Sequence, residues 1–149
     1  EECLVDVQIQ AHIPESYIGD LRQRLEIYRR IADIRTRDDA LDVTDELIDR
    51  FGEPPASVNG LIEIALLRNQ ASGLGITEVK QQGEVMLFYK SSIDIKQVSA
   101  LVSRLKKRVM INAGAKPYIS VKIEQSPLQT LTDTLSVLAE QPAERSAAP

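Results

Sequence analysis

The chain has 149 residues, about the size of one ordinary domain, and 43% of them are hydrophobic, which is enough for a single core. Its net charge of −4 argues against a protein that binds DNA or RNA non-specifically, because that class needs a positive surface. The single cysteine, Cys3, cannot form an internal disulfide, and no apolar run approaches the roughly 20 residues that span a bilayer. Because the first residues also lack a signal-peptide pattern, these features predict a cytoplasmic protein.

The N-terminal half is predicted to begin as a strand and to continue as helices. Residues 4–12 alternate apolar and polar side chains, the pattern of a half-buried strand. The chain starts inside this pattern without an initiator methionine, so we expect it to be a piece of a longer polypeptide. Asp20 is placed to cap a helix, whose apolar stripe comprises Leu21, Leu25, Ile27, Tyr28 and Ile31. Two further helices are predicted over about 38–50, ending before Gly52, and over about 56–72.

The C-terminal half mixes strands and helices. Residues 76–80 and 85–89 are predicted as two strands around a hairpin turn, and residues 117–123 as a third. A helix is expected from Asp94 through Arg108, and another from Ser126-Pro127. Residues 141–149 are poor in hydrophobic side chains and are expected to be disordered. This order predicts an α+β fold, with a small mixed or antiparallel sheet packed by about five helices in a single domain over residues 1–140. The inward positions expected on the helix from Asp94 are Ile95, Val98, Leu101, Val102 and Leu105.

The sequence contains no recognisable catalytic or metal-binding pattern. Gly73 and Gly75 follow a helix rather than precede one, so they do not make a phosphate-binding loop. His12 is the only histidine and lies on the polar side of its predicted strand, where a surface histidine is the ordinary interpretation. We therefore expect this chain to be no enzyme by itself and to hold no metal or cofactor.

The helix predicted over 38–50 carries a row of carboxylates. Asp42, Asp45, Glu46 and Asp49 share one face at about 100° per residue. A solvated helix face is the simplest interpretation, but the helix has no lysine to pair with them, and Asp49 lies near the C-terminal end, where the helix dipole disfavours an anion. The row therefore favours docking on a basic partner surface. A small hydrolase that uses these carboxylates is an alternative. The residues expected on the opposite, core-facing side are Leu41, Thr44, Leu47, Ile48 and Phe51.

A basic cluster ends the helix predicted over 94–108. It consists of Arg104, Lys106, Lys107 and Arg108. Cations near a helix C-terminus are locally favourable, and no aromatic residues are interleaved with these four. A contact with nucleic acid through this cluster is the alternative function.

Two long segments resemble a known family. They are IPESYIGDLRQRLEIYRRIA (13–32) and ELIDRFGEPPASVNGLIEIALLR (46–68), followed more weakly by ASGLGI (71–76) and the hairpin. In combination they resemble the C-terminal domain of the bacterial transcription-repair coupling factors, over about residues 5–125. Gly19 departs from the family pattern, which has proline there, and this predicts a looser start of the first helix.

The resemblance implies a function for the parent protein. The parent is expected to be a cytoplasmic ATP-dependent DNA translocase that removes stalled RNA polymerase and recruits UvrA, with ATP and Mg bound by motor domains outside this chain. In the family, the C-terminal domain packs on the parent's UvrB-like domain, masks the UvrA-binding surface and restrains the motor until polymerase is engaged.

The resemblance also implies which residues dock. Glu46, Asp49 and Arg50 match the family segment E-x-x-D-R-F-G, which lies at or near that contact. We expect Glu46 and Asp49 to pair with arginines of the UvrB-like domain, with Asp42 and Asp45 beside them. Arg50 has two alternatives: it bonds across the interface, or it ties its own helix end to a carboxylate.

Overall fold

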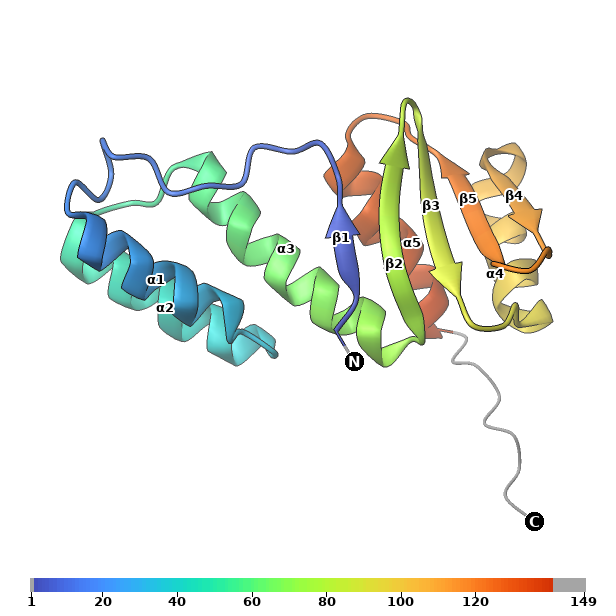
Figure 1. The fold of residues 1–149 in the computed structure, drawn as a ribbon, viewed down its shortest axis with the longest axis horizontal. Helices are drawn as coiled ribbons and strands as arrows, with labels where there is room; N and C mark the ends of the chain where they lie inside the picture. Colours follow the sequence, from blue (N-terminus) through green and yellow to red (C-terminus); the bar gives the residue numbers. More distant parts are fainter. Residues whose placement is uncertain (1, 141–149) are drawn as a thin grey trace, which may run out of the picture. The chain divides into compact units, whose positions relative to one another are not determined.

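The computed structural model describes residues 2–140, and these divide into two compact units (Figure 1). The helical unit comprises residues 9–69, and the sheet unit comprises residues 2–8 together with residues from 70 onward. The predicted disordered tail, 141–149, lies outside the described residues. None of the helices described is long and apolar enough to cross a membrane.

The helical unit contains α1 (Leu21–Ala32), α2 (Arg37–Phe51) and most of α3 (Ala56–Gly73). The predicted caps are present: Asp20 Oδ1 accepts a hydrogen bond of 2.9 Å from the Gln23 amide at the start of α1. Gly52, at φ +85°, ends α2 in the left-handed region that glycine tolerates best. The three helices expected from the sequence are therefore confirmed.

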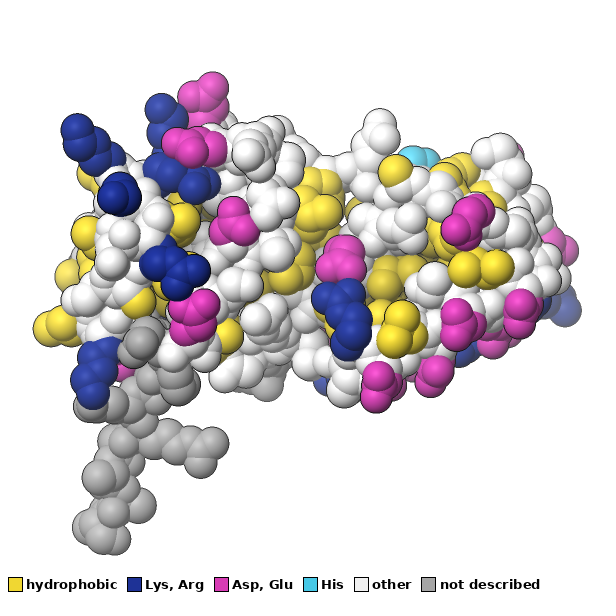
Figure 2. Space-filling model, turned by 180° about the vertical axis from the view of Figure 1, so that it is seen from behind, with side chains coloured by type: hydrophobic (Ala, Val, Ile, Leu, Met, Phe, Trp, Pro, Cys, Tyr) yellow, Lys and Arg dark blue, Asp and Glu magenta, His cyan; other side chains and the backbone are white. Residues whose placement is uncertain are grey.

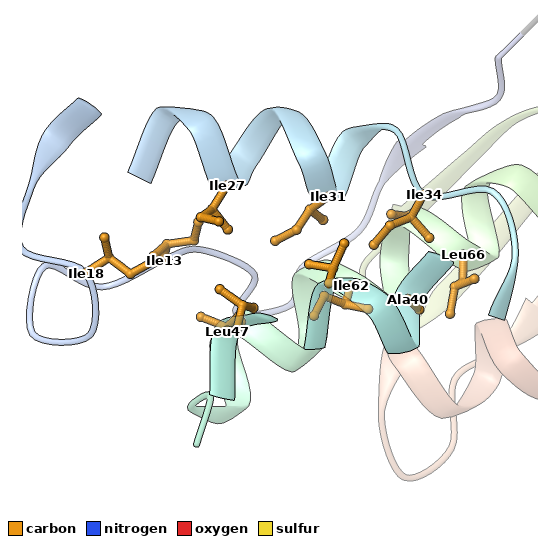
Figure 3. Packing of buried hydrophobic residues seen from close by; sticks show 12 residues of the cluster. Ile13, Ile18, Ile27, Ile31, Ile34, Ala40, Leu47, Ile62 and Leu66 are labelled. Carbon is orange, nitrogen blue, oxygen red and sulfur yellow. The ribbon is translucent and has the colours of Figure 1, made fainter. Parts of the chain in front are cut away.

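Aliphatic side chains from all three helices and the preceding segment form the core of the helical unit (Figure 3). The core-facing prediction for α2 was wrong at Leu41 and Ile48, which are 53% and 41% exposed. α2 buries a narrower stripe, and each of these two residues lies one position, about 100°, past a buried one. Leu21 and Leu25 on α1, predicted in its apolar stripe, are likewise exposed. The buried members of the core are Ile13, Ile18, Ile27, Ile31, Ile34, Ala40, Val43, Leu47, Val58, Ile62, Ala65 and Leu66.

The residues that carry the family resemblance hold the helical unit together. The Tyr28 hydroxyl accepts a hydrogen bond of 2.8 Å from the Ile13 amide. The Tyr17 hydroxyl donates to the Gly52 carbonyl at 2.7 Å, and its ring lies 6.0 Å from that of Phe51. Partial burial, assisted by the negative charge of Glu53, raises the pKa of Tyr17. These motifs therefore act as scaffold contacts between segments distant in the sequence.

The start of α1 is fixed despite the glycine at position 19. The Arg24 guanidinium donates to the carbonyl oxygens of Ile18 and Gly19 at 2.8 and 3.0 Å. Together with the Asp20 cap, these bonds give the helix start a defined geometry that does not depend on proline.

The sheet unit contains a mixed five-stranded sheet in the order β1-β2-β3-β5-β4. β1 pairs with β2 in parallel, and the other neighbours are antiparallel, so the predicted α+β class with a mixed sheet is confirmed. The strand predicted over 4–12 pairs only over Leu4–Asp6; after it, the Gln8 amide donates to the Gln81 side chain and the His12 amide to the Ser57 carbonyl. β4 was not predicted, since none of its residues is fully buried and it lacks an inward pattern. The strands are β1 (Leu4–Asp6), β2 (Ile76–Gln82), β3 (Val85–Lys90), β4 (Val109–Asn112) and β5 (Tyr118–Lys122).

Helices α4 (Ile95–Leu105) and α5 (Pro127–Glu140) pack against each other and against one face of the sheet (Figure 1). Met86 and Phe88 of β3 and Ile119 and Val121 of β5 are fully buried. Their alternate spacing places them on a common face of the sheet.

The helix predicted through Arg108 ends earlier, at Leu105. Lys106 adopts φ +55° and ψ −124°, which interrupts the α-helix, and a short 3-10 turn, η1 (Lys106–Arg108), follows. Two of the residues predicted to point inward, Ile95 and Val102, are exposed. The hydrophobic spacing thus located α4 correctly but overestimated the width of its buried face.

Candidate docking surface

Three aspartates form an acidic ridge on the outer face of α2. Asp42, Asp45 and Asp49 are all exposed, and none of the three has an ion-pair partner within residues 2–140. Figure 2 shows acidic side chains gathered along the helical unit. We call Asp42, Asp45 and Asp49 the acidic ridge, because their charge is not compensated locally.

Glu46, the fourth predicted member of the row, lies toward α1. Its carboxylate forms an ion pair with Arg30 of α1 and accepts a hydrogen bond of 3.0 Å from Arg50, four residues on. The hydrogen bond from Arg30, followed by that from Arg50, holds the pKa of Glu46 below its usual range. The structure therefore separates Glu46 from the ridge. The expectation that these carboxylates lack a partner along the helix is therefore wrong for Glu46, because Arg50 pairs with it in place of the missing lysine.

Arg50 is held by several groups of its own unit. Besides Glu46, its guanidinium lies 3.9 Å from the Glu26 carboxylate and 4.9 Å from the centre of the Phe51 ring. Of the two alternatives for Arg50, the structure contains the tie to a carboxylate of its own helix. Arg50 thus links α1, α2 and the turn at Phe51-Gly52.

The acidic ridge borders exposed apolar side chains on the same helix. Leu41 and Ile48 lie seven residues apart, so about 20° of rotation separates them. Asp45 lies between them in sequence, at about 40° from Leu41 and about 60° from Ile48. The outer surface of α2 therefore consists of the acidic ridge beside an apolar strip, which we define as Leu41 and Ile48. Figure 2 shows apolar side chains beside acidic ones on this unit.

The basic cluster lies on the sheet unit and is partly neutralised. Arg104 pairs with Glu140 at 2.8 Å, and Arg108 lies 3.7 Å from Glu124 while donating to the Lys122 carbonyl at 3.0 Å. Within the described chain, Lys106 and Lys107 have no ion-pair partner. A surface hollow of about 440 Å³ is lined by residues 104–108 and Glu124.

The remaining reactive side chains form no constellation. His12 is exposed, and Cys3 is buried with its thiol donating a hydrogen bond of 3.5 Å to the Leu4 carbonyl. Over residues 2–140 there is no group of three or more His, Cys, Asp or Glu side chains that could hold a metal ion.

Comparison with known proteins assigns this chain to a family. The profile of the TRCF domain matches residues 7–101, more than half of the chain. The chain belongs to the TRCF-domain family. The matched range includes α1, α2 and the whole acidic ridge, whereas the basic cluster at 104–108 lies beyond it.

Relatives of this TRCF domain are much longer proteins. It is 35% identical over 85 residues to the transcription-repair-coupling factor of Staphylococcus aureus, covering 57% of this chain and 7% of that protein. It is 31% identical over 118 residues to the factor of Staphylococcus epidermidis, covering 73% of this chain and 10% of that protein. The chain thus spans about a tenth or less of the relatives it matches.

A solved structure shares the fold. The crystal structure of the C-terminal domain of a transcription-repair coupling factor superposes with a TM-score of 0.83, covering 95% of this chain and 94% of that one at 23% identity. At this identity the match establishes the fold. Together with the family profile, it confirms the resemblance that the motifs indicated.

Proposed function

We propose that this chain is a non-catalytic regulatory domain of a transcription-repair coupling factor. In this proposal it docks on the UvrB-like domain of the same parent, masks the UvrA-binding surface and restrains the DNA translocase until stalled RNA polymerase is engaged. The observation that carries the proposal is the acidic ridge: three uncompensated aspartates on one exposed helix face, inside the segment that the family profile matches.

The charge of the helical unit supports a basic partner. Residues 9–69 hold eight arginines and twelve acidic residues, which gives this unit a net charge of −4. Arg24, Arg30, Arg37 and Arg50 form ion pairs with glutamates of the same unit, whereas the three ridge aspartates form none among the described residues. Complementary charges raise association rates and select orientation, and salt screens them over about 8–10 Å.

The ridge aspartates and Glu46 have different roles in this proposal. Asp49, with Asp45 and Asp42, meets arginines of the partner directly, because its carboxylate has no competing ion pair. Glu46 is one-third exposed, and a carboxylate offers about four acceptor positions, so it can accept a partner arginine while still holding Arg30 and Arg50.

Titration of the chain with the UvrB-like domain of the same parent tests the proposal. The variant Asp45→Asn/Asp49→Asn removes two ridge charges without touching the Glu46 network. We expect its affinity to fall on the order of tenfold and its salt dependence to flatten. The matched control, Asp6→Asn/Glu84→Gln, removes two exposed charges from the sheet unit and should bind like the unmodified chain. Equal affinity for all three proteins would refute the docking role of the ridge.

Masking of UvrA is tested separately. UvrA binds only the undocked state in this proposal, so adding the chain to the UvrB-like domain should reduce UvrA binding. An equilibrium of this kind shifts only if the activating partner binds the open state more tightly. UvrA binding that is unaffected by a saturating amount of the chain would contradict the masking step while leaving docking intact.

A second candidate function is a nucleic-acid contact through Arg104, Lys106, Lys107 and Arg108. It is favoured by the lack of ion-pair partners for Lys106 and Lys107 among the described residues. It predicts binding of a DNA probe at low salt that weakens steeply as salt rises and is lost in Lys106→Gln/Lys107→Gln. Absence of binding at low salt would remove this function.

A further inference from the structure

Exposed apolar side chains border the acidic ridge where a core position was expected. Leu41 and Ile48 are 53% and 41% exposed, and both lie on the same flank of α2. Single exposed leucines are common in proteins. Leu41 and Ile48, however, lie at nearly the same rotation on α2 and beside the three aspartates of the acidic ridge. One partner surface can therefore contact the apolar strip and the ridge together.

We infer that Leu41 and Ile48 form the apolar half of the docking surface, and that the partner presents an apolar patch bordered by arginines. This inference rests on the proposed function and adds the chemistry of the partner surface to it. Strong interfaces commonly bury an apolar centre inside a polar or charged rim. On α2, the apolar strip and Asp45 are close enough in rotation for one partner surface to cover both.

The charge of the surroundings selects α2 over the other exposed apolar pair of the helical unit. Leu21 and Leu25 on α1 are 61% and 48% exposed, but the exposed charged residues beside them are Arg22, Arg29 and Glu26, and the Glu26 carboxylate already lies 3.9 Å from Arg50, so positive charge predominates. A partner rimmed by arginines is repelled there and attracted at the acidic ridge. The same partner chemistry therefore fits the strip on α2 and disfavours the one on α1.

The two strips contribute to affinity in different ways. Charge pairs at a solvent-accessible rim weaken as salt rises, whereas burial of apolar surface does not. Covering Leu41 and Ile48 also removes water from beside Asp45, which strengthens its pairing with an arginine. The affinity that remains at high salt is thus assigned to the apolar strip.

Titrations with the UvrB-like domain at low and high salt test this assignment. Leu41→Ser/Ile48→Ser is expected to bind roughly thirtyfold more weakly at both salt concentrations, with the salt dependence unchanged. Leu21→Ser/Leu25→Ser is the matched control and should bind like the unmodified chain. Circular dichroism and thermal unfolding show whether each variant keeps its fold, which is expected because all four side chains are exposed.

The outcomes separate this inference from the proposed function. If Asp45→Asn/Asp49→Asn weakens docking but Leu41→Ser/Ile48→Ser does not, the acidic ridge docks and the apolar strip has no part in it. If the α1 and α2 leucine variants weaken docking equally, the choice of α2 is wrong. If the unmodified chain shows no binding at either salt concentration, both the proposed function and this inference are refuted.

Discussion

The helical unit and the sheet unit use basic residues differently. All seven lysines of the chain lie in the sheet unit, whereas every basic residue of the helical unit is an arginine. Arginine presents a planar fork that suits carboxylates, and in the helical unit Arg24, Arg30, Arg37 and Arg50 each pair with a glutamate of the same unit. The arginine ion pairs of this unit therefore go to glutamates, and the three aspartates on the outer face of α2 form none among the described residues.

This difference shows why the net charge of a whole chain is a poor guide to its partners. Over residues 1–8 and 70–149 the sheet unit has ten basic and ten acidic residues, a net charge of zero, against −4 for the helical unit. The total of −4 for the full chain does not show that this excess lies in the helical unit. Partner chemistry is better judged from the charges that stay unpaired on each unit.

The substitutions with the largest expected effect on stability test whether the two units unfold together. Leu47 in the helical unit and Phe88 in the sheet unit are both fully buried. We expect Leu47→Ala to cost about 3 kcal/mol and Phe88→Ala about 4 kcal/mol in the free energy of unfolding. If residues 1–140 form one domain, each substitution lowers the stability of both units, and urea unfolding followed by hydrogen exchange detects a single shared transition. Loss of protection confined to the substituted unit would show two independent domains.

Glycine-to-alanine substitutions in α3, with a smaller expected effect on stability, test the packing of this helix within the helical unit. A Cβ at Gly60 would lie 2.8 Å from the Gln10 carbonyl oxygen, a backbone atom, so Gly60→Ala should cost about 1–3 kcal/mol despite the better helix propensity of alanine. Gly73, at the other end of the same helix, has nothing within 4 Å of the corresponding position. Gly73→Ala is therefore expected to be neutral or to stabilise by up to about 1 kcal/mol. Thermal unfolding of the two variants would contradict this assignment if both moved in the same direction.

The ion pair between α1 and α2 is expected to contribute less. Arg30 and Glu46 are about one-third exposed, so Glu46→Gln should cost about 0.2–1 kcal/mol at pH 7. The pKa of Glu46 is lowered in the folded state, so its stabilising effect is complete above the usual carboxyl range and disappears as the pH falls through that lowered pKa. Urea unfolding from pH 7 to acidic pH should show the difference between the variant and the unmodified chain shrinking. A difference that grows toward acidic pH would mean that Glu46 is not held by these arginines.

Local signals predicted the helix starts and the end of α2 well, although the end of α4 was placed three residues too late. The caps at Asp20, Asp94 and Ser126 and the glycine after α2 depend on hydrogen bonds within a few residues, which a sequence shows directly. The family motifs supplied the docking assignment, because nothing in the composition or spacing names a partner.

Features set by tertiary packing were predicted less well. Leu41 and Ile48 look like core residues by type, but how wide a face α2 buries depends on the size of its neighbours. Similarly, the pairing of Glu46 with Arg30 joins two helices and leaves no signature in the spacing of α2. β4 escaped prediction because only its pairing with β5 defines it. For the docking surface, spacing located the carboxylates, and the structure decided which of them are free.

The smallest expected effect concerns Asp49 and has opposite signs for stability and docking. Asp49 lies in the last turn of α2, where the helix dipole is unfavourable to an anion, and it follows Asp42 and Asp45 on one face. Asp49→Asn should therefore stabilise the isolated chain by a few tenths of a kcal/mol, up to about 0.5. The same change should weaken docking, since it removes a ridge charge. Thermal unfolding and titration with the UvrB-like domain measure the two effects on one protein.

Asp39, on the same helix, is expected to stabilise the fold and to play no part in docking, the opposite of Asp49. Its carboxylate accepts hydrogen bonds from the Arg35 and Thr36 amides at 3.0 and 3.1 Å, and these bonds lower its pKa. Asp39→Asn should destabilise the chain by weakening this N-terminal capping box, and it should leave docking unchanged because the ridge is intact. A carboxylate that stabilises the helix locally needs no partner, whereas one that is locally unfavourable is the better candidate for a binding role. Destabilisation by Asp49→Asn, or weakened docking of Asp39→Asn, would break this distinction between the scaffold and docking carboxylates of α2.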